Sequence, residues 1–135
     1  MDYKVKIIAE DKSEILFEKN IKKVDIMFDT VEPNVVSKGA GMLARITIIG
    51  GIDTEGRNAN QLTKLFDWAK SEESEEQYRT VDVEIWNSTT RHRTFHFERM
   101  FVEDYEEEYD TQKDTKFTLK LIQQEHNFDK AKTGQ

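Results

Sequence analysis

The residues most suggestive of chemistry lie in one acidic segment, FVEDYEEEYD, at residues 101–110. It places six carboxylates within ten residues, with Phe101, Tyr105 and Tyr109 between them. Carboxylates at this density could bind a hard cation such as Ca²⁺, or act as an acid–base pair of the glycosidase type. They could also simply keep one side of a strand hydrated.

The conformation of the segment decides between these roles. Successive side chains of a strand point to opposite faces, so the segment should divide into two sets. The predicted sets are Glu103, Tyr105, Glu107 and Tyr109 on one face, and Asp104, Glu106 and Glu108 on the other. Carboxylates two residues apart lie about 7 Å from each other, too far to share one ion without another strand. We interpret the segment as a strand whose acids meet solvent, a channel or nearby basic side chains, and expect no catalytic residue, metal or cofactor.

A second segment, GIDTEGRN at residues 51–58, lies between an apolar run and a helical pattern. A phosphate-binding loop occurs in the same context, but here Arg57 replaces its lysine and Asn58 replaces its hydroxyl residue. Asp53 and Glu55 would place negative charge where a phosphate would bind. The segment is therefore interpreted as a glycine-containing turn that leads into a helix capped by Asn58 or Asn60.

His92 and His96 have the spacing of a helical zinc pair. Their surroundings alternate like a strand, in which four residues span about 13 Å. We therefore expect surface or cross-strand histidines. The chain has no cysteine, which excludes disulfides and thiolate zinc sites.

The composition predicts one globular domain. The chain has 135 residues, 35% of them charged, and a net charge of −7, which disfavours sequence-specific nucleic-acid binding. No stretch approaches the roughly 20 apolar residues of a membrane span, so we expect no membrane insertion. We expect residues 1–124 to form the domain, and residues 125–135, which lack periodicity, to form a flexible tail.

Alternation of apolar and polar residues is the dominant pattern. It predicts about seven or eight strands, around Tyr3–Ile7, 15–17, 24–28, 43–49, 81–85, 92–105 and 117–121. One helical stripe, Leu62, Leu65, Phe66 and Ala69, predicts a single helix near residues 60–71. The expected fold is mainly β: a small β-barrel or two packed antiparallel sheets, with the helix covering one end.

The order of these parts resembles a known family. The order is IMFDT, the excursion with SKGAGM, the strand ARITIIGG, the helix NANQLTKLFDWAK, the hairpin TVDVEIWNSTTRHRTFHFERMFVEDYEEEY, and the strand KFTLKLIQQEH. It is similar to the tube proteins of contractile injection machines, which include the Hcp protein of type VI secretion and phage tail-tube proteins. The resemblance implies a β-barrel with one helix that assembles into hexameric rings, which stack into a hollow tube.

The resemblance also implies interfaces and partners. Apolar residues of the excursion are candidates for burial by a second copy, namely Val35, Val36, Met42 and Leu43. The acidic strand is a candidate for a surface facing the lumen or solvent, with Glu103, Asp104, Glu106, Glu107 and Glu108. The implied partners are further copies of the chain and sheath or baseplate components. The chain would be cytoplasmic before assembly, and part of a phage tail, a bacteriocin-like particle or a secretion apparatus afterwards. The alternative is a small barrel that binds a ligand or a partner within a larger complex.

Overall fold

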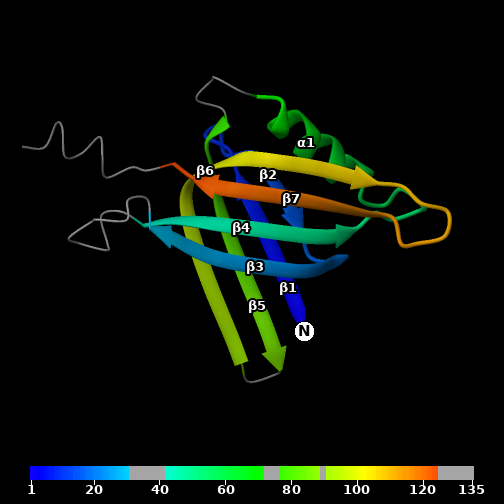
Figure 1. The fold of residues 1–135 in the computed structure, drawn as a ribbon, viewed down its shortest axis with the longest axis horizontal. Helices are drawn as coiled ribbons and strands as arrows, with labels where there is room; N and C mark the ends of the chain where they lie inside the picture. Colours follow the sequence, from blue (N-terminus) through cyan, green and yellow to red (C-terminus); the bar gives the residue numbers. More distant parts are fainter. Residues whose placement is uncertain (31–41, 72–76, 89–90, 125–135) are drawn as a thin grey trace, which may run out of the picture.

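The structure is a computed structural model that describes residues 1–30, 42–71, 77–88 and 91–124. These residues form seven strands and one helix (Figure 1). In chain order they are β1 (Asp2–Ile8), β2 (Glu14–Phe17), β3 (Ile21–Thr30), β4 (Met42–Gly51), α1 (Ala59–Ala69), β5 (Arg79–Ser88), β6 (Arg91–Glu108) and β7 (Lys116–Gln123). The predicted flexible tail, residues 125–135, lies outside the described residues. Within the described part, no helix is long and apolar enough to cross a membrane.

All seven strands belong to one antiparallel sheet in the order β2-β1-β5-β6-β7-β4-β3. The predicted mainly-β class with a single helix is confirmed. The sheet is not closed, because β2 and β3 remain as its two edges. The strands form one open sheet, where a small β-barrel or two packed antiparallel sheets were predicted. It encloses its core by folding over on itself instead of joining its edges.

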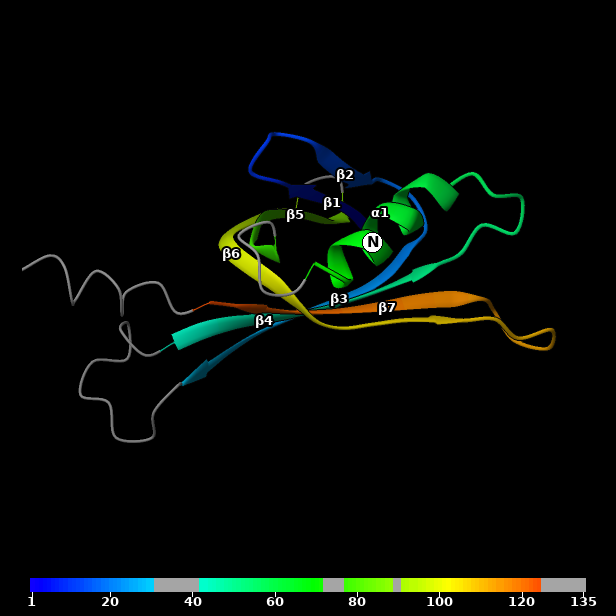
Figure 2. The same ribbon diagram turned by 90° about the horizontal axis from the view of Figure 1, so that it is seen from above.

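The long strand β6 produces this fold. Its residues 91–100 pair with β5, whereas residues 100–108 pair with β7. Figures 1 and 2 show that β6 bends between these two parts and carries the sheet from one layer into the other. We call β2, β1, β5 and residues 91–100 the β5 half. Residues 101–108 with β7, β4 and β3 form the β7 half.

The core lies between the two halves, and α1 covers one end of it (Figure 2). Phe17 of the β5 half contacts Phe117 of the β7 half, with ring centroids 5.4 Å apart. Phe28 and Phe97 bridge the halves in the same way, at 6.1 Å. Each half therefore has a core face, which meets the other half, and an outer face.

The helix buries Leu62, Leu65 and Trp68 in this core. Trp68 is 1% exposed, and its indole Nε1 donates a hydrogen bond to the backbone carbonyl of Gln77 at 2.8 Å. Phe66, predicted to lie on the buried stripe, is half-exposed instead. The apolar stripe is rotated toward Trp68, whose larger side chain takes the core position and whose polar atom finds a partner there.

Candidate functional site

Two β-bulges in β6 decide where its side chains point. The register of β6 shifts near Arg99, whose φ is +60°, and again between Val102 and Asp104. A bulge adds one residue to one strand and so reverses the alternation beyond it. Phe95, Phe97 and Phe101 have the same parity in the sequence, which predicts a shared face. The prediction is wrong for Phe101, since it lies opposite Ile122 on the outer face.

The second bulge moves Glu103 as well. Glu103 was predicted on the face of Tyr105, but its carboxylate lies 3.3 Å from Arg45 Nη1, on the outer face of β4. The other outer acids follow in register opposite β7: Asp104 opposite Lys120, Glu106 opposite Thr118, and Glu108 opposite Lys116. Of these, Glu108 lies 3.9 Å from Lys116 Nζ. Exposed pairs of this kind add little to stability, so the outer acids are a hydrated surface.

Glu107 points the other way, to the core face. Its carboxylate accepts hydrogen bonds from the hydroxyls of Tyr105 and Tyr109. Burial, and then the bond to Glu107, raises the pKa of the Tyr105 hydroxyl, while the bond to Glu107 raises the pKa of Tyr109. Both hydroxyls therefore remain protonated donors at neutral pH. The predicted grouping of Tyr105, Glu107 and Tyr109 is correct.

The two histidines form separate cross-strand clusters on the outer face of the β5 half. His92 stacks on Trp86, with centroids 4.7 Å apart, and its Nε2 lies 3.3 Å from Glu84. His96 Nδ1 lies 2.5 Å from Asp82, and this hydrogen bond raises the pKa of the imidazole. In the described part of the chain, no three His, Asp or Glu side chains are placed to hold a metal ion.

The loop at residues 51–58 closes on itself. Asn58 is buried, and its side chain donates to the Gly51 carbonyl and accepts from the Asp53 amide, both at 3.0 Å. Asn58 occupies the N-cap position without a capping bond to the helix. The Arg57 guanidinium binds the Asp53 carboxylate and lowers its pKa. Through these bonds the polar side chains of the loop hold the turn, which agrees with the predicted structural role.

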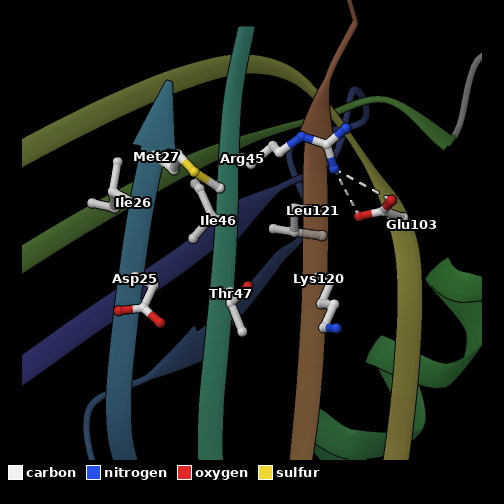
Figure 3. A pocket seen from close by; sticks show the side chains of 9 residues that line it. All are labelled: Asp25, Ile26, Met27, Arg45, Ile46, Thr47, Glu103, Lys120 and Leu121. Carbon is white, nitrogen blue, oxygen red and sulfur yellow. Dashed lines mark hydrogen bonds and ion pairs between the residues drawn. The ribbon is translucent and has the colours of Figure 1, made fainter. Parts of the chain in front are cut away.

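The outer face of the β7 half carries a groove of about 660 Å³. Its charged lining comes from neighbouring strands: Asp25 from β3, Arg45 from β4, Lys120 from β7 and Glu103 from β6 (Figure 3). Arg45 and Glu103 are paired across the groove. With acids on its two outer strands and bases on its two inner strands, the groove is a mixed-charge surface of a four-stranded wall.

That wall has two open edges. Among the described residues, β3 pairs only with β4, and residues 101–108 of β6 pair only with β7. The large apolar side chains that remain exposed cluster beside these edges or at the start of β1. They are Met27 at 53%, Phe28 at 52%, Phe66 at 50%, Tyr109 at 67% and Met1 at 69%. Exposed apolar groups beside an unpaired edge are the features of an interaction surface.

The sequence pointed to a different stretch for this surface. Val35 and Val36 lie outside the described residues, as does the side chain of Met42, although Met42 begins β4. Leu43 is half-buried in β4, in register with Asp29 of the edge strand β3. The apolar residues at the edges were missed. The Ile26–Met27–Phe28 run, which interrupts the alternation of β3, is the signal that could have found them.

The edges and the bent strand define a class of fold: an open, antiparallel sheet folded over on itself, with one helix covering an end of its core and an open strand edge on each side of its four-stranded half. Comparison of the chain with models of known protein families and with curated protein sequences finds no match.

Proposed function

We propose that this protein is a structural subunit that assembles head to tail into rings, which stack into a hollow tube. The observation that carries the proposal is the pair of open edges on the β7 half. Long unpaired edges expose backbone N–H and C=O groups that pair readily with another strand. A subunit with one such edge on each side can repeat its contact around an axis, and a ring closes when the rotation between copies does.

The directions of the two edges are compatible. Every neighbouring pair among β6, β7, β4 and β3 is antiparallel, so the first and last of these four strands run in opposite directions. If β3 of one copy meets residues 101–108 of the next, the joint is again antiparallel. The wall can therefore continue from copy to copy without a change of strand pattern.

The charges of the two edges are complementary. In an antiparallel joint, the start of one strand lies against the end of the other. The start of β3 carries Lys22 and Lys23, whereas the end of β6 carries Glu106, Glu107 and Glu108. The proposed contact thus sets basic against acidic side chains, which favours this pairing over one between two β6 edges.

The similarity to tube proteins adds what the edges alone do not specify. It implies six copies per ring, stacking through the excursion that precedes Leu43, a secretion or phage-tail setting, and sheath or baseplate partners. The groove of Figure 3 would lie on one surface of the ring wall. A ligand- or partner-binding module, the alternative, would instead use a hollow interior. Trp68, Phe117 and the other core residues fill the space between the halves, which favours assembly.

Assembly is tested first on the unmodified chain. Size-exclusion chromatography with light scattering and negative-stain microscopy should find closed rings at high concentration. A strictly monomeric particle without rings contradicts the proposal.

Disulfide trapping tests the joint itself, because the chain has no cysteine of its own. Lys23→Cys is combined in turn with Asp104→Cys, Glu106→Cys or Glu108→Cys, which covers three registers that keep the outer faces matched. One of the three should give covalent oligomers on oxidation, since a disulfide requires Cα atoms about 4.4–6.8 Å apart. Lys23→Cys with Lys64→Cys, on the exposed side of α1, is the matched control and should give none.

A further inference from the structure

The end of the β5 half projects past the open edge of β3. In Figure 1, β1, β5 and the first part of β6 continue beyond β3, and Figure 2 shows that they lie in the other layer. We call this projection the arm. On its core face it carries Tyr3, Ile85 and Phe95, each half-buried, in line with the fully buried Val5, Val83 and Phe97. Phe28 lies at the β3 edge beside them, against Phe97. Tyr3, Ile85 and Phe95 form the arm cluster.

A second apolar cluster lies beside the other open edge. A groove of about 390 Å³ separates α1 from the end of the acidic segment. Ile52, Leu62, Phe66 and Tyr109 provide its apolar lining, and we call them the groove cluster. Glu107 contributes a carboxylate to the same groove. Phe66 and Tyr109 are among the most exposed large apolar side chains of the described residues.

We propose that the arm cluster of one copy binds the groove cluster of the next copy, so that each joint has a second, apolar layer behind the paired strands. This inference rests on the proposed function for its partner, a second copy of the chain. It goes further in naming side chains outside the strand pairing that hold neighbouring copies together.

The position of the arm supports this pairing. A strand added to the edge of β3 extends the β7 half across the arm, because the arm lies in the layer that faces it. If the added strand is β6 of the next copy, its core face, with Tyr105 and Glu107, must turn toward the arm, since the faces of a continuous sheet stay matched. Tyr109 and the groove of that copy then also lie on the side that faces the arm.

The charges agree with the apolar match. The Arg93 guanidinium lies 5.1 Å from the Phe95 ring on the arm, whereas Glu107 lies in the groove. Each cluster thus carries a charge opposite to that of its proposed partner. Two arm clusters facing each other would bring like charges together, as would two groove clusters, so the contact favours unlike patches.

Two variants disrupt one cluster each. Tyr3→Ser removes a ring from the arm side, and Phe66→Gln removes one from the groove side. Phe66 is half-exposed and Tyr3 lies near the start of β1, so the fold should survive, which circular dichroism checks. Tyr109→Ser, at the most exposed ring of the groove, serves if Phe66→Gln lowers stability. Lys64→Gln, elsewhere on α1, is the matched control.

Each variant alone should need at least about tenfold higher concentration for half-assembly than the unmodified chain, while the control should not. Because each variant keeps one intact patch, an equimolar mixture of the two should form one-to-one dimers at concentrations at which neither variant assembles alone, and these dimers should grow no further there. Light scattering of the mixture and of each variant alone measures this.

The outcomes separate the two proposals. If the unmodified chain forms rings and both variants form them equally well, the arm-to-groove contact is wrong while the proposed function stands. If the unmodified chain forms no rings but the mixture still gives dimers, the contact is right and the ring function is wrong. A monomer in every sample overturns both.

Discussion

Two adjacent glycines of β4 should respond in opposite ways to the same substitution. A Cβ at Gly50 would lie 2.5 Å and 2.6 Å from ring carbons of Phe117, and 2.9 Å from the backbone oxygen of Asn20. A Cβ at Gly51 would meet only the Lys22 side chain, at 3.3 Å, with every other atom at 3.9 Å or beyond. Gly50 faces the core, whereas the neighbour of Gly51 is the far end of a flexible side chain.

The expected magnitudes follow from these contacts. Overpacking a core costs about 1–3 kcal/mol, and Phe117 is fully buried and cannot move aside freely. Gly50→Ala should therefore lower the free energy of unfolding by about 2 kcal/mol. Replacing glycine within a strand recovers about 0.5–1 kcal/mol of backbone entropy when nothing clashes. Gly51→Ala should then be neutral or stabilise the protein by up to about 1 kcal/mol.

Urea unfolding followed by tryptophan fluorescence measures both, since Trp68 is buried in the core. With a urea dependence of about 1–3 kcal/mol per molar, Gly50→Ala should lower the midpoint by about 1 M. Phe117→Leu removes the ring carbons that a Cβ at Gly50 would meet. The double variant Gly50→Ala with Phe117→Leu should therefore lose less free energy of unfolding than the sum of the two single variants. Equal effects at both glycines, or strict additivity in the double variant, would refute the packing of Phe117 on Gly50.

Three further predictions concern the core, pH and the proposed joint. Trp68→Phe should lower the free energy of unfolding by about 2–4 kcal/mol in urea unfolding followed by circular dichroism, because it leaves a cavity and an unpaired Gln77 carbonyl. The hydrogen bond to Asp82 raises the pKa of His96 in the folded protein above its ordinary value near 6.5. The contribution of His96 to the free energy of unfolding is therefore complete below that value and is lost as the pH rises through the folded pKa. The urea midpoint should thus fall as the pH rises from the ordinary histidine value near 6.5 through the folded pKa, and Asp82→Asn should remove this part of the slope; an unchanged slope contradicts it. Lys23→Glu and Glu106→Lys should each weaken ring assembly, as measured by light scattering. The double variant should assemble again, and its failure to do so argues against the charge match.

Alternation along the sequence located the strands well because it reports local burial. It anticipated the runs around Val5, Ile46, Val83 and Leu119, each of which has a buried core face. The helix was found for the same reason. Alternation does not predict which strands pair, because a period of two carries no information about neighbours across the sheet. The open edges could therefore not be predicted from it.

The errors within β6 have a local cause. A bulge changes the face of every residue beyond it, yet Arg99 takes a positive φ without the glycine that usually marks such a position. Phe101 and Glu103 were assigned to the wrong faces, while Tyr105 and Glu107 were grouped correctly because both lie beyond the second bulge. The length of β6, 18 residues, is the remaining signal, since a strand spanning about 60 Å exceeds one layer of a small domain.

The acidic segment acquires a physical role in the proposed assembly. An open strand edge rich in apolar residues would pair with any similar edge, including another copy of itself. Carboxylates along residues 103–108 oppose that outcome, because two such edges side by side would bring like charges together. The same carboxylates favour an edge that begins with Lys22 and Lys23. Six acids in ten residues would then select the partner strand and its direction.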